Sequence, residues 1–133
     1  MNTELIAQMW HALGQSEAEF IEAFYRRFFE RFPGYRKLFP HQLRPAHLEK
    51  MIHTMALMAN LSEDQAIIAP HMHKLGAAHK PFELERRDMN NFKEVFIEML
   101  GEQLGARWTA TAAQAWNSAF DEVLIPLMRE GMK

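Results

Sequence analysis

The feature that most constrains this chain is a run of aromatic residues at helical spacing. In the stretch SEAEFIEAFYRRFFERF (16–32), phenylalanine recurs at every fourth position, at Phe20, Phe24, Phe28 and Phe32. Side chains four positions apart lie on the same face of an α-helix. Ser16 and Glu19 form a capping box at the start of this stretch. The pattern predicts a long helix over 16–32 whose broad aromatic face must be covered by other helices.

The rest of the sequence repeats the helical period. Further helices are predicted over 3–13, 45–60, 70–79, 90–105 and 109–130, with a tight corner over 33–40 and a loop near 80–88. Pro45 and Pro70 suit the first turns of helices. Ser62 and Gln65 form a second capping box, and Pro126 is expected to bend or fray the last helix. Because no β-strand pattern, repeat or linker is found, the sequence predicts one all-α domain over 1–133 with six to eight helices.

The composition argues against several classes of function. The formal net charge is −2, which gives no strong attraction to nucleic acid or to an acidic membrane surface. No apolar run approaches the about 18 residues of a membrane span, and the start does not look like a signal peptide. The sequence has no cysteine for a disulfide, a thiolate nucleophile or a zinc site. We therefore expect a cytoplasmic protein that binds neither nucleic acid nor a membrane.

Two histidines lie on the apolar faces of separate predicted helices. His79 ends one such face and His47 begins another, while Tyr25 lies on the inner side of the aromatic helix. The apolar neighbours at helical spacing are Ile68, Met72 and Leu75 for His79, and Met51, Met55 and Met58 for His47. A single buried histidine is usually satisfied by a nearby carbonyl group. Two of them and a tyrosine, among ten methionines and ten phenylalanines, favour a haem pocket, because haem needs apolar walls and a firm axial bond to imidazole.

Four segments of the chain resemble the bacterial single-domain globins, those that are similar to the haem domain of flavohaemoglobins. The segments are FYRRFFERFPGYRKLFP, HLEKM, LGAAHKPF and LGARWTATAAQAW, and they occur in the order of the family over essentially the full length. The resemblance implies a three-on-three globin fold around haem b (iron protoporphyrin IX). It also places Trp116 in the core of that fold.

The resemblance assigns residues to both faces of the haem. His79 is implied to be the proximal iron ligand, with its other ring nitrogen held by a main-chain oxygen such as that of Leu75. His47, 32 residues earlier in the sequence, is implied to be the distal histidine, with Tyr25 on the same side of the iron. The other implied haem contacts are Phe39, Lys50 (to a propionate), Met51, Leu75, Phe82 and Phe92.

The function that the resemblance implies is reversible binding of O₂, for oxygen handling or sensing. The Tyr25 O–H and the His47 N–H are candidate donors to bound O₂, which carries partial negative charge. NO and CO are expected to bind at the same place. Two alternatives stay open: nitric-oxide dioxygenation with electrons from an external reductase, and a redox protein in which His47 is the sixth iron ligand.

The chain departs from flavohaemoglobins behind the proximal histidine. Those haem domains place a tyrosine and a glutamate there, and the corresponding positions here fall at Met89 and near Gly131, beside Glu130. Without this support we expect less imidazolate character in His79 and weaker dioxygenase or peroxidase-like chemistry. The sequence contains no GxGxxG fingerprint, so a reductase would be a separate protein. The HMH segment at 71–73 is predicted to face solvent rather than to bind a metal, because residues two positions apart on a helix point apart.

Overall fold

A computed structural model describes residues 2–13, 17–39, 45–59 and 66–133 of the chain. Within these ranges it contains seven α-helices and no β-strand. The helices are α1 (Thr3–His11), α2 (Glu17–Arg31), α3 (Pro45–Ala59), α4 (Ile68–His79), α5 (Arg86–Leu104), α6 (Ala110–Ala119) and α7 (Ile125–Gly131). Between them lie the 3₁₀ segments η2 (Pro33–Leu38), η3 (Lys80–Phe82) and η4 (Gly105–Arg107), and the π-helical segment η5 (Phe120–Leu124). The predicted all-α fold with six to eight helices is confirmed for the described residues.

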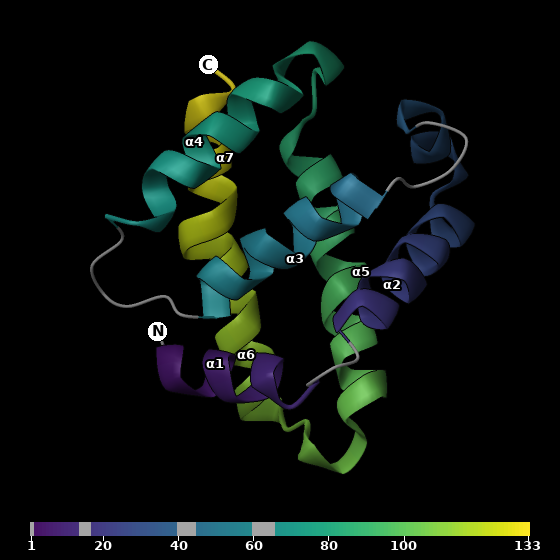
Figure 1. Cartoon of the computed structure of the whole chain (residues 1–133), viewed down its shortest axis with the longest axis vertical. Helices are drawn as coiled ribbons and strands as arrows, with labels where there is room; N and C mark the ends of the chain where they lie inside the picture. The colour runs from purple at the N-terminus through teal and green to yellow at the C-terminus, as the bar shows by residue number, and fades with distance from the viewer. Residues whose placement is uncertain (1, 14–16, 40–44, 60–65) are drawn as a thin grey trace.

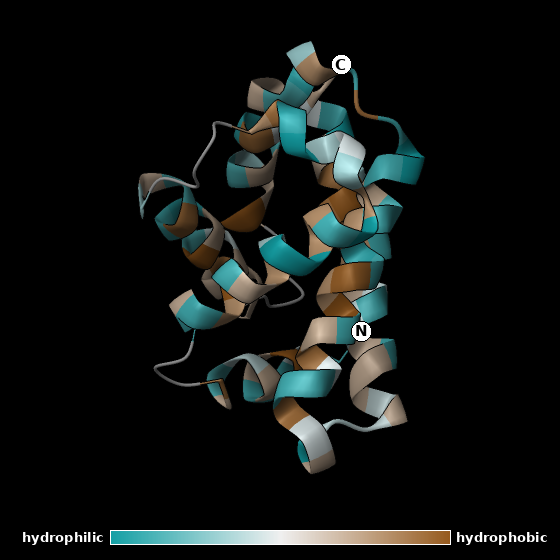
Figure 2. Ribbon diagram, turned by 90° about the vertical axis from the view of Figure 1, so that its right-hand side faces the viewer, coloured by the Kyte–Doolittle hydropathy of each residue, from teal (hydrophilic) through white to brown (hydrophobic). Residues whose placement is uncertain are grey.

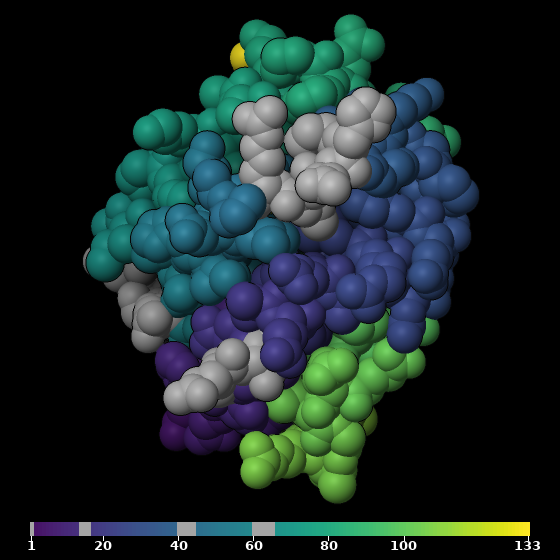
Figure 3. All heavy atoms as spheres, turned by 45° about the vertical axis from the view of Figure 1, so that its right-hand side comes forward, coloured from purple at the N-terminus to yellow at the C-terminus, as the bar shows by residue number. Residues whose placement is uncertain are grey.

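The helices pack in two crossing layers (Figure 1). One layer contains α1, α3 and α4, and the other contains α2, α5 and the continuous α6–η5–α7 segment. Between the layers, α3 packs on α2, α1 packs on α6, and α4 makes its most extensive contacts with α7. Figure 3 shows α3 lying between α4 and α2 on one face of the molecule. This arrangement brings the helices that carry His47 and His79 into the same layer.

The aromatic face of α2 forms the centre of the core. Phe20, Phe24 and Phe28 are buried, and the ring centroid of Phe24 lies 4.7 Å from that of Phe92 in α5. Phe32 is only partly buried, because α2 ends one residue before it. Figure 2 shows hydrophobic residues gathered on the inward sides of the helices. None of the described helices is both long and apolar enough to cross a membrane.

Two helices begin earlier than the sequence predicts. α4 begins at Ile68 rather than Pro70, which is possible because Pro70 then lies in the first turn, where a missing N–H loses no helical hydrogen bond. α5 begins at Arg86, so the predicted loop near 80–88 is shorter than expected. A capping box between Glu85 and Asp88 starts α5.

The two capping boxes predicted at helix starts cannot be compared with the structure. Ser16 of the first box and both Ser62 and Gln65 of the second lie outside the described residues. The predicted helix over 16–32 is confirmed within one residue at its C-terminal end, since α2 spans Glu17–Arg31.

The last predicted helix is interrupted by a wider turn instead of fraying at its end. The π-helical segment η5 lies directly before Pro126, and α7 continues beyond that proline to Gly131. Pro126 has no N–H to donate to the carbonyl group of Glu122, four residues earlier. A single π-helical turn inside an α-helix can accommodate such a break. The chain therefore stays helical as it passes behind α4.

Candidate functional site

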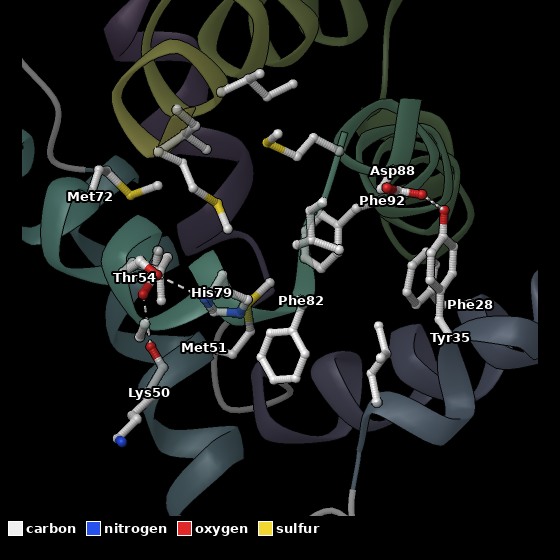
Figure 4. Close-up of a pocket in the computed structure, with 18 of the residues that line it drawn as sticks. Phe28, Tyr35, Lys50, Met51, Thr54, Met72, His79, Phe82, Asp88 and Phe92 are labelled. Atoms are coloured by element: carbon white, nitrogen blue, oxygen red, sulfur yellow. Dashed lines mark hydrogen bonds between the residues drawn. The ribbon is translucent and has the colours of Figure 1, made fainter. Parts of the chain in front are cut away.

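A cavity of about 460 Å³ lies between the two layers. Its walls come from α2, η2 and α3 on one side and from α4, η3, α5, η5 and α7 on the other. The residues that the sequence predicted for haem contact all line it, namely Phe39, His47, Lys50, Met51, Leu75, His79, Phe82 and Phe92, and so does Tyr25. Figure 4 shows His79, Met51 and Phe82 reaching toward one another in this cavity. The structure thus brings together residues that lie on five separate elements, and their haem contacts stay a prediction.

His79 is the last residue of α4, and its ring is fixed by its own helix. Its Nδ1–H donates to the main-chain oxygen of Leu75 at 2.8 Å. Because that nitrogen holds the proton, the lone pair of the neutral ring lies on Nε2. The Phe82 ring packs beside it, with its centroid 5.9 Å from that of the imidazole. The helix thus ends with an imidazole at the cavity wall in one tautomer and one orientation.

Two glycines set the position of α4 against α7. A methyl group at Gly76 would overlap the carbonyl group of Met128, and one at Gly131 would overlap the main chain of His73. The helix backbones can cross this closely only because both residues lack a side chain. His73 donates a hydrogen bond to Glu130 at the same crossing, with 2.9 Å between Nε2 and Oε2. The crossing therefore determines the position of His79 at the end of α4.

The same crossing bears on the glutamate of flavohaemoglobins. Gly131, near the position that the resemblance assigns to this glutamate, has no room for a side chain, and Glu130 pairs with His73 rather than with His79. Met89, the position that the resemblance assigns to the tyrosine, is buried and lines the cavity. Within the described part of the chain, the Leu75 carbonyl is therefore the hydrogen-bond acceptor for His79. This favours a neutral imidazole over one with imidazolate character.

Tyr25 and His47 lie together on the other wall. The phenolic oxygen is 3.5 Å from His47 Nε2, and the Phe39 ring packs on both, with centroids at 5.5 Å and 5.4 Å. Burial raises the pKa of Tyr25, which keeps its phenol protonated as a donor. Burial also lowers the pKa of His47, and the nearby His79 and Lys50 add to this effect. Both groups are therefore neutral near pH 7 and can serve as hydrogen-bond donors.

A buried hydroxyl group in the cavity wall was not predicted. Thr54 of α3 donates its hydroxyl proton to the carbonyl oxygen of Lys50 at 2.9 Å. His71 Nε2 lies 2.9 Å from Thr54 Oγ1. Because the single hydroxyl proton of Thr54 already goes to the Lys50 carbonyl, the His71 N–H donates to the hydroxyl oxygen. The prediction that both histidines of the HMH segment face solvent is therefore wrong for His71, which is half-buried and links α4 to α3. His73 is exposed, as expected.

Tyr35 and Asp88 also line the cavity and were not predicted. Tyr35 lies in the corner segment η2 and Asp88 in the first turn of α5, and the phenol donates to the carboxylate at 2.5 Å. They are more than fifty residues apart, so no local pattern links them. Lys50 lies at the cavity edge, where its exposed side chain extends into solvent (Figure 4).

The donor set of the cavity fits haem better than a bare metal ion. The described residues contain no group of three His, Cys, Asp or Glu side chains that could hold a metal ion. The porphyrin of haem supplies four nitrogen ligands to the iron, so the protein has to supply one axial ligand and an apolar pocket. His79 Nε2 can serve as the axial ligand. The phenylalanine, leucine and methionine side chains of the cavity can form the apolar pocket.

Fold and site together define a class of protein: an all-α, two-layer molecule with an apolar cavity between two histidine-bearing helices. A comparison with models of known families matches residues 22–126 to the globin family. The chain belongs to the globin family, which confirms the predicted globin fold. It is thus a haem-binding globin, of a family that generally carries haem b and binds diatomic gases such as O₂. The closer resemblance to bacterial single-domain globins stays a prediction.

Proposed function

We propose that this globin binds O₂ reversibly at a haem b whose iron is ligated by His79. The observation that carries the proposal is the position of the His79 imidazole, fixed by Leu75, opposite the Tyr25–His47 pair in one apolar cavity. When bound, the haem would supply an iron atom that takes up a diatomic gas. The chain would supply the axial nitrogen, the dry walls and the donors.

The side chains that line the cavity would have different roles. Phe39, Met51 and Phe92 would hold the haem by packing and exclude water from it. The Tyr25 phenol, kept protonated by burial, would donate to bound O₂ and stabilise its partial negative charge. Lys50 would pair with a propionate at the cavity edge.

The test of this proposal uses the His79→Gly variant. We expect the purified wild-type protein to show a Soret band and a stable oxygenated spectrum that reverts when O₂ is removed. His79→Gly should lose most of its haem, and added imidazole should restore haem binding by filling the vacated position. A Soret band in His79→Gly equal to the wild-type band, without imidazole, would contradict the assignment of His79. Rapid oxidation in air with no stable oxygenated form would contradict reversible O₂ binding.

A bis-histidine redox role is a second candidate, since the lowered pKa of His47 keeps its ring neutral and able to ligate iron. The absorption spectrum of the ferrous protein without gas separates the two candidates. A five-coordinate spectrum supports the O₂-binding role, and a six-coordinate spectrum that converts in His47→Leu supports the redox role.

Nitric-oxide dioxygenation with an external reductase is the third candidate. The hydrogen bond of His79 to a carbonyl group rather than a carboxylate argues for slow turnover. Nitrate formation from NO by the oxygenated protein, with a generic reductase present, measures this activity directly.

A further inference from the structure

A tyrosine and an aspartate form a short hydrogen bond in the cavity wall (Figure 4). The Tyr35 hydroxyl donates to Asp88 Oδ1 at 2.5 Å, and Asn91 Nδ2 donates to the same hydroxyl oxygen at 3.0 Å. The other oxygen of Asp88 accepts the main-chain N–H of Glu85 at 2.8 Å. The cap of α5 therefore holds the carboxylate in place against the phenolic proton.

The Tyr35 ring lies directly beside the cavity. It stacks on Phe28 with centroids 5.0 Å apart and an angle of 7° between the rings. Tyr35, Phe28 and Asp88 all line the cavity, and Tyr35 is half-buried. Because this ring lines the cavity, Tyr35 is placed to exchange an electron with a group bound there.

One-electron oxidation of a phenol releases its proton, so it is favoured where a base already accepts that proton. Tyr35 has such a base in Asp88. Tyr25, the other tyrosine of the chain, has His47 Nε2 only at 3.5 Å, which is the limit of a hydrogen bond. The indole nitrogen of Trp116 is buried and has no hydrogen-bond partner among the described residues. Of these three oxidisable rings, Tyr35 alone has a base in position.

The phenol of Tyr35 does not ionise by itself near neutral pH. Burial raises its pKa, and the hydrogen bond to Asp88 raises it further. Loss of the electron and loss of the proton are therefore expected to be coupled.

We propose that Tyr35 is a one-electron donor in the reduction of an oxidant that enters the cavity, with Asp88 as the acceptor of its proton. In this step the O–H bond of Tyr35 breaks, the electron passes to the oxidant and the proton passes to Asp88 Oδ1. The neutral phenoxyl radical that is left keeps its hydrogen bond from Asn91. An enediol reductant of the ascorbate class then gives up one electron, and its own proton to solvent, while Asp88 returns its proton to the phenoxyl oxygen, which restores the phenol.

The oxidant belongs to the class of hydroperoxides. A hydroperoxide takes up two electrons and two protons as its O–O bond breaks, which gives an alcohol and water, or two waters from H₂O₂. Tyr35 would supply one electron at a time. This inference rests on the proposed function only in that haem is the place where the hydroperoxide reacts. Because the Nδ1–H of His79 donates to the Leu75 carbonyl rather than to a carboxylate, we expect slow peroxide reduction that protects the pocket rather than fast turnover.

The first experiment compares the two tyrosines as matched variants. The haem-loaded protein is mixed with H₂O₂, frozen and examined by electron paramagnetic resonance. We expect a tyrosyl radical in the wild type and in Tyr25→Phe, its loss in Tyr35→Phe, and a weaker signal in Asp88→Asn. Tyr35→Phe keeps the ring that stacks on Phe28, so the fold should be preserved. An undiminished tyrosyl signal in Tyr35→Phe, or its loss in Tyr25→Phe, would overturn the proposal.

A second experiment separates this proposal from the proposed function. Photogenerated tris(bipyridine)ruthenium(III) replaces H₂O₂ as the oxidant, so that no haem chemistry is needed. We expect the same radical at Tyr35, formed more slowly in D₂O because a proton moves with the electron. Equal radical yields in wild type and Tyr35→Phe would overturn the proposal. A radical with ruthenium but none with H₂O₂ would overturn the donor role toward the cavity, whereas loss of reversible O₂ binding alone would contradict only the proposed function.

Discussion

At the scale of single residues, the site depends on protons whose positions are fixed by nearby groups. The Leu75 carbonyl accepts a hydrogen bond from the Nδ1–H of His79, which leaves the lone pair on Nε2 available for the proposed bond to iron. Burial raises the pKa of Tyr25, so its phenol stays protonated. The hydroxyl oxygen lies 3.5 Å from His47 Nε2, which leaves the phenolic proton available to a ligand. Each of these side chains therefore presents one defined hydrogen-bonding role.

Tyr25→Phe tests the proposed donor to bound O₂. One hydrogen bond of about 1–3 kcal/mol corresponds to about five- to over a hundred-fold in affinity, and we expect O₂ to dissociate about tenfold faster from the variant. The phenyl ring keeps the packing against Phe39, so the pocket should retain its shape. Stopped-flow measurement of O₂ release checks this, with His47→Leu measured alongside. A rate unchanged in Tyr25→Phe but raised in His47→Leu would assign the donor role to His47.

At the scale of helices, the crossing of α4 and α7 determines the position of His79. The crossing depends on the absence of side chains at Gly76 and Gly131. Glycine is unfavourable inside a helix, and its presence here is explained by the close approach of the two backbones.

Gly76→Ala should lower the free energy of unfolding. Alanine improves helix propensity by about 1 kcal/mol, but its methyl group would overlap the Met128 carbonyl and force two helix backbones apart. Overpacking of this kind costs about 1–3 kcal/mol, and contact with a rigid backbone places it at or above the upper end. Gly34→Ala is the matched control, since a methyl group there meets nothing within 4 Å. Equal urea-unfolding midpoints for the two variants would show that the crossing is not tight.

The junction between α3 and α4 should be sensitive to acid. Burial lowers the pKa of His71 below its ordinary value of 6.5, and the nearby His53 and Lys74 lower it further. Between the folded pKa and 6.5 the unfolded chain binds more protons at this position, so stability falls as the pH is lowered through that window. We expect His71→Gln to lose part of this pH dependence while His73→Gln keeps it. Urea unfolding at several pH values checks this, and the same slope in wild type and His71→Gln would refute it.

At the scale of the whole molecule, the two layers create a cavity that no single element contains. The family match over residues 22–126 covers both helices that carry the histidines, α3 and α4. The cavity lies where these helices face the other layer, and its walls draw on segments from Tyr25 to Met128. The haem-binding site expected of a globin therefore exists only when all these helices are packed together.

Whether a contact can be predicted from the sequence depends on how many residues separate its two partners in the chain. The hydrogen bond from His79 to Leu75 could be predicted, because residues four apart on a helix are neighbours. The Tyr35–Asp88 and Thr54–His71 pairs could not, since they join separate elements. The early starts of α4 and α5 were missed because helix ends depend on caps and on local competition.

The sequence by itself determined the helices, their buried faces and the inward positions of His47 and His79, because these follow from the spacing of neighbouring side chains along one helix. Only the tertiary structure decided that Tyr35 meets Asp88, that His71 reaches Thr54, and that Gly131 has no room for a side chain. Those contacts depend on the angle and distance at which helices cross, and these are set by packing over the whole molecule.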